Sequence, residues 1–145
     1  MRAADRPSDA TRTAPTVRTA AAARAHAQSV VRERWDAQGR MLREDDVVDL
    51  TLVVSELVTN AIRHGAGLAG FDVEPTPDGV RLAVHDHSDV VPDVAYGSGA
   101  LPADHHGSGY GWPLIIRLAR DIAIDRRAGG GKTIRVFVPL RDVSG

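Results

Sequence analysis

The sequence contains no cysteine among its 145 residues, and this absence excludes several kinds of chemistry. A chain without cysteine has no disulfide bonds, no thiolate nucleophile and no zinc site built from cysteine thiolates. Such a composition fits a protein that works in a reducing compartment. We therefore expect a cytoplasmic location.

Long hydrophobic runs and a strong net charge are also lacking. No apolar run approaches the ~20 residues that span a bilayer, and the opening stretch MRAADRPSDATRTAPT has no apolar segment like that of a signal peptide. The formal net charge is −1, so no overall field attracts nucleic acid or an anionic membrane. We expect neither nucleic acid nor a membrane as a direct partner.

The apolar residues that are present are sufficient for one hydrophobic core. They make up 43% of the sequence, beside 26% charged residues, which is ordinary for a globular domain of this length. The polar composition of residues 1–15 predicts a flexible N-terminal tail. Residues 16–141 are then expected to form a single domain.

Hydrophobic periodicity changes along this domain from helical to alternating. Glycines end the first two helical patterns, and the turns TPDG and AGGG separate the alternating ones. Helices are predicted over residues 17–37, 44–64 and 112–120, and strands over 70–75, 79–87, 121–127 and 132–140. This order predicts an α/β (α+β) two-layer sandwich, with a mixed, mostly antiparallel sheet and helices on one face.

Glu56 and Asn60 lie four residues apart in the second predicted helix, so their side chains share one side of it. On a helical wheel this side is opposite the apolar arc, which indicates an ordinary solvated face. Asparagine is a poor helix former, however, and its amide oxygen is a good ligand for Mg²⁺. A glutamate one turn away could accept a proton from a hydroxyl group or a water. The helix alone leaves both interpretations open.

Of two glycine-rich stretches that are similar to phosphate-binding loops, only the first is a candidate for contact with phosphate groups; the second is better interpreted as a hairpin turn. The stretch GSGYG, at residues 107–111, precedes a predicted helix, where backbone N–H groups favour phosphate; a flexible loop is the alternative. The stretch GGGKT, at residues 129–133, does not fit a P-loop, because Arg126 occupies a required glycine position and a strand pattern follows. The long irregular segment 89–111 is predicted to be functional or disordered.

Asp86 stands between two histidines at the end of a predicted strand. An ionised aspartate only accepts hydrogen bonds, so a buried Asp86 would need a donor such as an exocyclic amino group. A charged strand end is an equally open interpretation. A metal site is a further alternative, and it would use the histidines at 85, 87, 105 and 106.

Taken in order, these motifs resemble those of the GHKL ATPase superfamily, whose members share the Bergerat ATP-binding fold. The stretch ELVTNAIRHG, residues 56–65, is similar to the N box, which is the most specific of the motifs. Asp86 matches the aspartate of the first glycine box, residues 107–111 match the second, and residues 129–133 match the last. Within the superfamily the chain most resembles the small bacterial anti-sigma factor serine/threonine kinases, over about residues 16–140.

The resemblance implies a protein kinase that uses ATP and Mg²⁺. The implied roles are catalytic base for Glu56, Mg²⁺ ligand for Asn60, adenine recognition by Asp86 with support from Thr133, and phosphate binding by Gly107, Gly109 and Gly111. The segment 89–111 would form a lid. The implied partners are a sigma factor and an anti-sigma antagonist protein, and the family often forms homodimers.

The first glycine box departs from the superfamily pattern D-x-G-x-G. The sequence here reads DHSDV from Asp86, with neither glycine. This departure favours an alternative function, a nucleotide-dependent binding module that holds its partner with little catalysis. A histidine-kinase catalytic fragment is disfavoured because no dimerisation helix pair with a phosphoacceptor histidine is recognisable. The fourth alternative is a metal-dependent hydrolase built on the histidine cluster.

Overall fold

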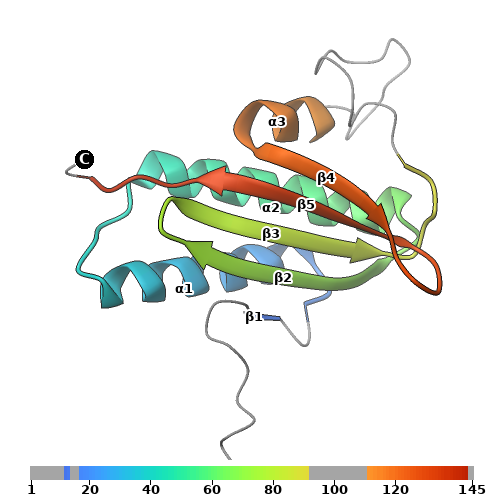
Figure 1. Ribbon diagram of the computed structural model, residues 1–145, viewed down its shortest axis with the longest axis horizontal. Coiled ribbons are helices and arrows are strands. Elements are labelled where there is room, and N and C mark those ends of the chain that lie inside the picture. The colour runs from blue at the N-terminus through green and yellow to red at the C-terminus, as the bar shows by residue number, and fades with distance from the viewer. Residues whose placement is uncertain (1–11, 14–16, 92–110, 144–145) are drawn as a thin grey trace, which may run out of the picture.

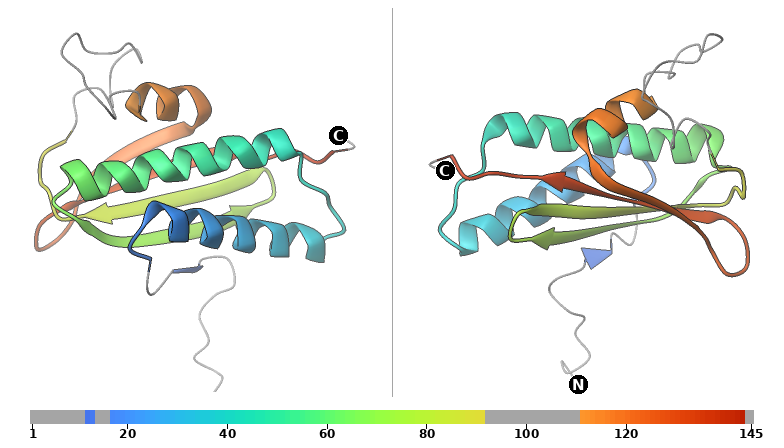
Figure 2. Two further views of the ribbon diagram at one scale, coloured as in Figure 1. Left: turned by 180° about the vertical axis from the view of Figure 1, so that it is seen from behind. Right: turned by 45° about the horizontal axis from the view of Figure 1, so that its top comes forward.

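The computed structural model describes residues 12–13, 17–91 and 111–143 (Figure 1). In this part of the chain, the helices α1 and α2 lie across one face of a five-stranded sheet, and α3 lies beside α2 (Figures 1 and 2). The helices are α1 (Ala20–Ala37), α2 (Glu44–His64) and α3 (Gly111–Leu118). The strands are β1 (Arg12–Thr13), β2 (Leu68–Thr76), β3 (Gly79–Asp86), β4 (Arg120–Arg126) and β5 (Lys132–Pro139).

The strand order is β1-β2-β3-β5-β4, and every pair of neighbours among these strands is antiparallel. The predicted α+β two-layer sandwich with helices on one face is therefore confirmed. The two hairpins lie beside each other because β3 pairs with β5, which places Asp86 opposite Lys132. Residues distant in the sequence thus meet at one end of the sheet.

The core lies between the helices and the sheet, and the strands follow the two-residue alternation of an amphipathic sheet. In β3, Val80, Leu82 and Val84 are buried, whereas Arg81 is exposed on the other face. Asp86 is the next member of the buried series. The same alternation that fills the core therefore turns the carboxylate of Asp86 toward the helical layer.

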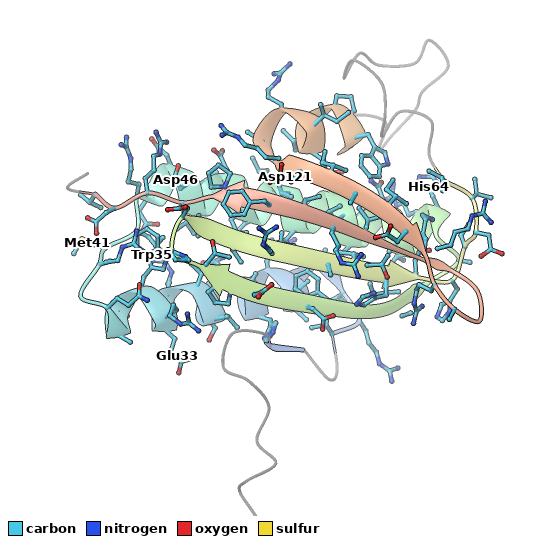
Figure 3. The ribbon with its side chains drawn as sticks, viewed as in Figure 1. Glu33, Trp35, Met41, Asp46, His64 and Asp121 are labelled. Atoms are coloured by element: carbon cyan, nitrogen blue, oxygen red, sulfur yellow. The ribbon has the colours of Figure 1, made fainter. Side chains whose placement is uncertain are left out.

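The helix α2 is fixed to the sheet at its N-terminal end by Asp46. This buried carboxylate accepts hydrogen bonds from the backbone N–H of Arg141 at 2.9 Å and from its Nε and Nη2 at 3.2 and 2.9 Å. These bonds hold the pKa of Asp46 below its usual value, although burial acts in the opposite direction. Figure 3 shows Asp46 near the end of β5, while His64 marks the other end of α2.

Part of the predicted tail takes part in the sheet. Arg12 and Thr13 pair with Val73 and Asp72 at the edge formed by β2, so these two residues form a short strand within the region expected to be flexible. Residues 1–11 and 14–16 lie outside the described part of the chain. None of the described helices is long and apolar enough to cross a membrane.

Candidate functional site

Three chain segments converge at one end of the sheet: the end of α2, the end of β3 and the turn before β5. The backbone N–H of His87 donates a hydrogen bond of 2.9 Å to the carbonyl of Gly65, at the end of α2. A Cβ atom on Gly65 would collide with the carboxylate of Asp86, and one on Gly131 would collide with the carbonyl of Asp86. Both positions therefore require glycine for close approach.

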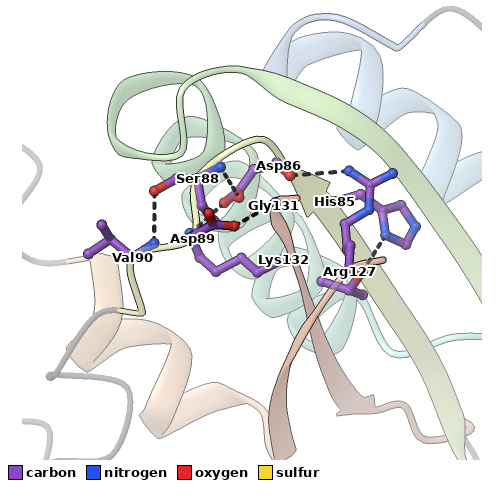
Figure 4. Close-up of polar contacts among 9 residues, drawn as sticks. His85, Asp86, Ser88, Asp89, Val90, Arg127, Gly131 and Lys132 are labelled. Carbon is purple, nitrogen blue, oxygen red and sulfur yellow. Dashed lines mark hydrogen bonds and ion pairs between the residues drawn. The ribbon is translucent and has the colours of Figure 1, made fainter. Parts of the chain in front are cut away.

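Asp86 lies at the centre of this junction and is only 2% exposed. The Nζ atom of Lys132 lies 2.9 Å from its Oδ2, and the backbone N–H of Ser88 donates to its Oδ1 at 3.0 Å (Figure 4). Lys132 is itself 3% exposed. The site thus contains a buried ion pair in which the carboxylate presents acceptors and the ammonium presents donors.

Asn60 is buried, with 9% of its surface exposed, and its Nδ2 has no hydrogen-bond partner among the described residues. The interpretation of its position as a solvated face is therefore wrong. An unsatisfied buried amide group costs about 1–3 kcal/mol. That cost is removed if a ligand accepts a hydrogen bond from Nδ2, so the nitrogen fits a place beside a phosphate oxygen, while a metal ion would be held by Oδ1.

Glu56, one turn before Asn60, is half-buried. Burial raises the pKa of Glu56, and the positive charge of Arg63 partly opposes this effect. A carboxylate with a raised pKa is better suited to accept a proton near neutral pH. The structure therefore places a potential base and a potential metal ligand on the same side of α2.

The segment after β3, where the family glycines are missing, is tied to the turn before β5. The carboxylate of Asp89 accepts a hydrogen bond of 2.8 Å from the N–H of Gly131, and Nη1 of Arg127 donates to the carbonyl of Asp86 at 3.2 Å. Lys132 reaches the carbonyl of Ser88 at 3.4 Å. Side chains thus hold this segment in a defined position (Figure 4).

Thr133 lies on the face of the sheet opposite Asp86, because successive side chains of a strand alternate. Its Oγ1 lies 2.7 Å from Nδ1 of His85, whose Nε2 lies 2.8 Å from Oδ2 of Asp72. The structure does not bring Thr133 to Asp86, as the implied support of adenine recognition requires. Lys132 occupies the position next to Asp86 instead.

The remaining predicted residues lie mostly outside the described part of the chain. Gly111 begins α3, but Gly107 and Gly109 precede the described residues of that region, as does most of the predicted lid. His105 and His106 also fall there. In the described part, no three His, Cys, Asp or Glu side chains gather in a way that could hold a metal ion.

Comparison with known families assigns the domain type. Residues 9–137 match the histidine kinase-like ATPase domain. The chain belongs to this family. The match confirms the GHKL-type superfamily and supports ATP binding, with ATP-dependent kinase or ATPase activity. No curated protein matches the chain.

Two residues of the site were not predicted from the sequence: Lys132 as the partner of Asp86, and Gly65 as the residue that lets the carboxylate approach α2. The sequence identifies this glycine as the end of a helix and of the N box, but not as a contact of Asp86. The sequence places Lys132 in the last glycine box and at the start of a strand, but its contact with Asp86 depends on the long-range pairing of β3 with β5.

Proposed function

We propose that this protein is an anti-sigma regulatory kinase that transfers phosphate from Mg-ATP to a serine or threonine of a small antagonist protein. The observation that carries the proposal is Asn60, a buried amide with an unsatisfied nitrogen in the N box. It lies one turn after Glu56, whose pKa is raised by burial. This combination supports a site for metal-bound phosphate next to a base.

In the proposed complex Asp86 accepts a hydrogen bond from the adenine amino group, and Asn60 holds Mg²⁺. The ion supplies charge neutralisation at the phosphates when it is bound. Gly107, Gly109 and Gly111 are proposed to approach the phosphates through their backbone N–H groups. Glu56 orients the acceptor side chain.

The proposed transfer joins the hydroxyl oxygen of the acceptor to the γ-phosphorus. The bond from that phosphorus to the bridging oxygen breaks, so ADP leaves with the electron pair, and the hydroxyl proton passes to Glu56. Such a reaction depends mainly on positioning and on stabilisation of charge. A carboxylate and an amide fixed one turn apart on the long helix α2 suit this requirement.

The proposed partners are the antagonist, as phosphate acceptor, and a sigma factor that the protein sequesters when the antagonist is unavailable. These partners place the protein in the cytoplasm. The family resemblance also favours a homodimer. The protein itself is not proposed to contact nucleic acid, in keeping with its net charge of −1.

A second candidate function is a nucleotide-dependent binding module with little catalysis. It is favoured by the segment after Asp86, which lacks the family glycines and is tied to the turn before β5 through Asp89 and Gly131. A restrained segment at this position would limit motions that follow nucleotide binding. The two candidates differ in whether phosphate reaches the partner.

The test begins with affinity capture from the native cell, with the purified chain as bait and with or without Mg-ATP. Captured antagonist candidates are then purified and incubated with the chain and ATP labelled at the γ-phosphate. Label on a serine or threonine of the antagonist supports the kinase. Nucleotide-dependent capture without label supports the binding module, and capture that is independent of nucleotide contradicts both.

A further inference from the structure

Lys132 lies directly beside Asp86, the residue proposed above to bind the adenine amino group. It faces Asp86 in the register of β3 and β5, it is 3% exposed, and its Nζ lies 2.9 Å from the carboxylate. We propose that Lys132 donates a hydrogen bond to ring nitrogen N1 of adenine while Asp86 accepts one from the neighbouring amino group. This inference rests on the proposed ATP binding.

The hydrogen-bonding capacity of the pair leaves room for a ligand. An ammonium group has three N–H donors. Lys132 directs them toward Oδ2 of Asp86 at 2.9 Å and the carbonyl of Ser88 at 3.4 Å, which accounts for two. The carboxylate likewise has more acceptor sites than its bonds to Lys132 and to the N–H of Ser88 occupy. One donor and further acceptor positions therefore remain.

The unused N–H donor of Lys132 and the unused acceptor positions of Asp86 match the hydrogen-bonding groups of adenine. Along its pairing edge, adenine presents a donor, the 6-amino group, beside an acceptor, N1. A carboxylate beside an ammonium presents an acceptor next to a donor, which matches that order. A 6-oxopurine presents an acceptor beside an N–H donor, so in the same orientation it would set oxygen against the carboxylate. The ion pair thus provides discrimination as well as affinity.

The fold has other means of holding this junction together. Arg127 already donates a hydrogen bond to the carbonyl of Asp86, and the backbone N–H of His87 donates one to the carbonyl of Gly65. A buried ion pair is often no more stabilising than apolar residues of similar volume, because both charges must be desolvated. A pair of buried charges at this position is therefore better explained by recognition of a polar ligand.

The experiment compares ATP with 1-deaza-ATP, in which a C–H group replaces N1, by calorimetric titration with Mg²⁺. The wild-type protein should bind 1-deaza-ATP about tenfold or more weakly than ATP, since a charge-assisted hydrogen bond is lost. Lys132→Met should bind ATP more weakly and should bind the two nucleotides with nearly equal affinity. If the variant keeps the wild-type ratio of affinities, the proposed contact is overturned.

Arg135→Met is the matched control, because it removes a cation from the same strand on the exposed face of the sheet. It should keep the wild-type ratio. If Lys132→Met does not fold, as judged by thermal melting, the wild-type comparison still decides: equal affinity for the two nucleotides overturns the inference. If wild-type protein binds neither, ATP binding itself is wrong, whereas ATP binding with no preference for N1 overturns only the role of Lys132.

Discussion

At the scale of single residues, the proposed function gives Glu56 and Asn60, on one side of the same helix, two separate roles. Asn60 is buried with an unsatisfied nitrogen, so its contribution is to the bound state, where a ligand can engage it. Glu56 is half-buried and negatively charged when ionised, so it repels phosphate in the ground state and contributes only when a proton moves. Binding and chemistry should therefore separate in variants.

Glu56→Gln should leave ATP affinity equal or slightly higher, because it removes a negative charge near the phosphates. The same change should slow phosphate transfer by roughly 10²-fold or more, which is the usual contribution of a general base. Asn60→Ala should instead weaken Mg-ATP binding, since the metal loses a ligand. Binding titrations beside radiolabel transfer to the antagonist measure both effects.

Glu44→Gln is the control for this comparison, because it removes an exposed carboxylate from the first turn of the same helix. Glu44→Gln should change neither the ATP affinity nor the rate of phosphate transfer. Transfer at the wild-type rate by Glu56→Gln would show that Glu56 is not the base.

Gly65→Ala should disturb the site directly, since the added Cβ would collide with the carboxylate of Asp86. The shift that relieves the collision should cost about 1–3 kcal/mol of unfolding free energy and weaken ATP binding on the order of tenfold. Thermal melting and calorimetric titration measure the two effects. Ala66→Gly serves as control, because Ala66 has a positive φ of 59° that glycine adopts readily. Unchanged ATP affinity in Gly65→Ala would contradict the place given to Asp86.

At the scale of secondary structure elements, α2 is fixed at both ends by contacts with the sheet. Asp46 binds Arg141 after the end of β5, and the carbonyl of Gly65 accepts the N–H of His87 after the end of β3. Glu56 and Asn60, the proposed base and metal ligand, lie between these two attachments. The position of the pair relative to Asp86 therefore depends on both.

Asp46→Asn should lower the melting temperature at neutral pH on the order of 5 °C. The reason is that residue 46 no longer carries the negative charge that strengthens its hydrogen bonds with the Arg141 guanidinium. The folded pKa of Asp46 is lowered, so its stabilisation is complete above the unfolded value of 3.8 and is lost as the pH falls through the folded value. The difference between variant and wild type should thus shrink in acid. Melting curves from neutral pH to about pH 2 test this window.

Asp45→Asn provides the matched control, because Asp45 is the exposed neighbour in the same first helical turn. It should show a smaller loss that reflects only the helix dipole. An equal loss in both variants would assign the effect to the dipole rather than to Arg141.

Local patterns predicted most element boundaries within a few residues. The predicted helix 44–64 coincides with α2, and the predicted strand 132–140 differs from β5 by one residue. Periodicity and glycine positions are properties of neighbouring residues, so a sequence can reveal them. The burial of Asn60 was not predictable in this way, because a helical wheel ranks the faces of one helix without knowing what packs against them.

At the scale of the whole molecule, the site joins both layers, since Asn60 belongs to the helical layer and Asp86 to the sheet. The resemblance of ordered motifs was sufficient to predict the superfamily and the sandwich. The strand order and register were not predictable, because the pairing of β3 with β5 is long-range. For this reason the contact of Lys132 with Asp86 was not predicted, and Thr133, which the resemblance implies as the support of Asp86, lies beside His85 instead.

Because the site spans the layers, Mg-ATP should stabilise the whole domain. At a nucleotide concentration about 100 times Kd, binding adds ~2.7 kcal/mol to the unfolding free energy. The melting temperature should then rise on the order of 5–10 °C. ATP with a chelator that removes Mg²⁺ should give a smaller shift, and Asn60→Ala should abolish the difference between the two conditions. Equal shifts in wild-type protein with and without Mg²⁺ would exclude a metal contribution to binding.

The antiparallel pairing of Asp86 with Lys132 also bears on how this domain tolerates change over evolutionary time. The chain between these residues forms α3 and the edge strand β4 before it returns to β5, and contacts of Asp89 and Arg127 join its two ends. The entropic cost of closing a loop grows only with the logarithm of its length, so doubling the length adds about 0.6 kcal/mol to the free energy of loop closure. A change in the number of residues between β3 and Gly107 should therefore cost little stability, because the pairing of Asp86 with Lys132 does not depend on the length of that stretch.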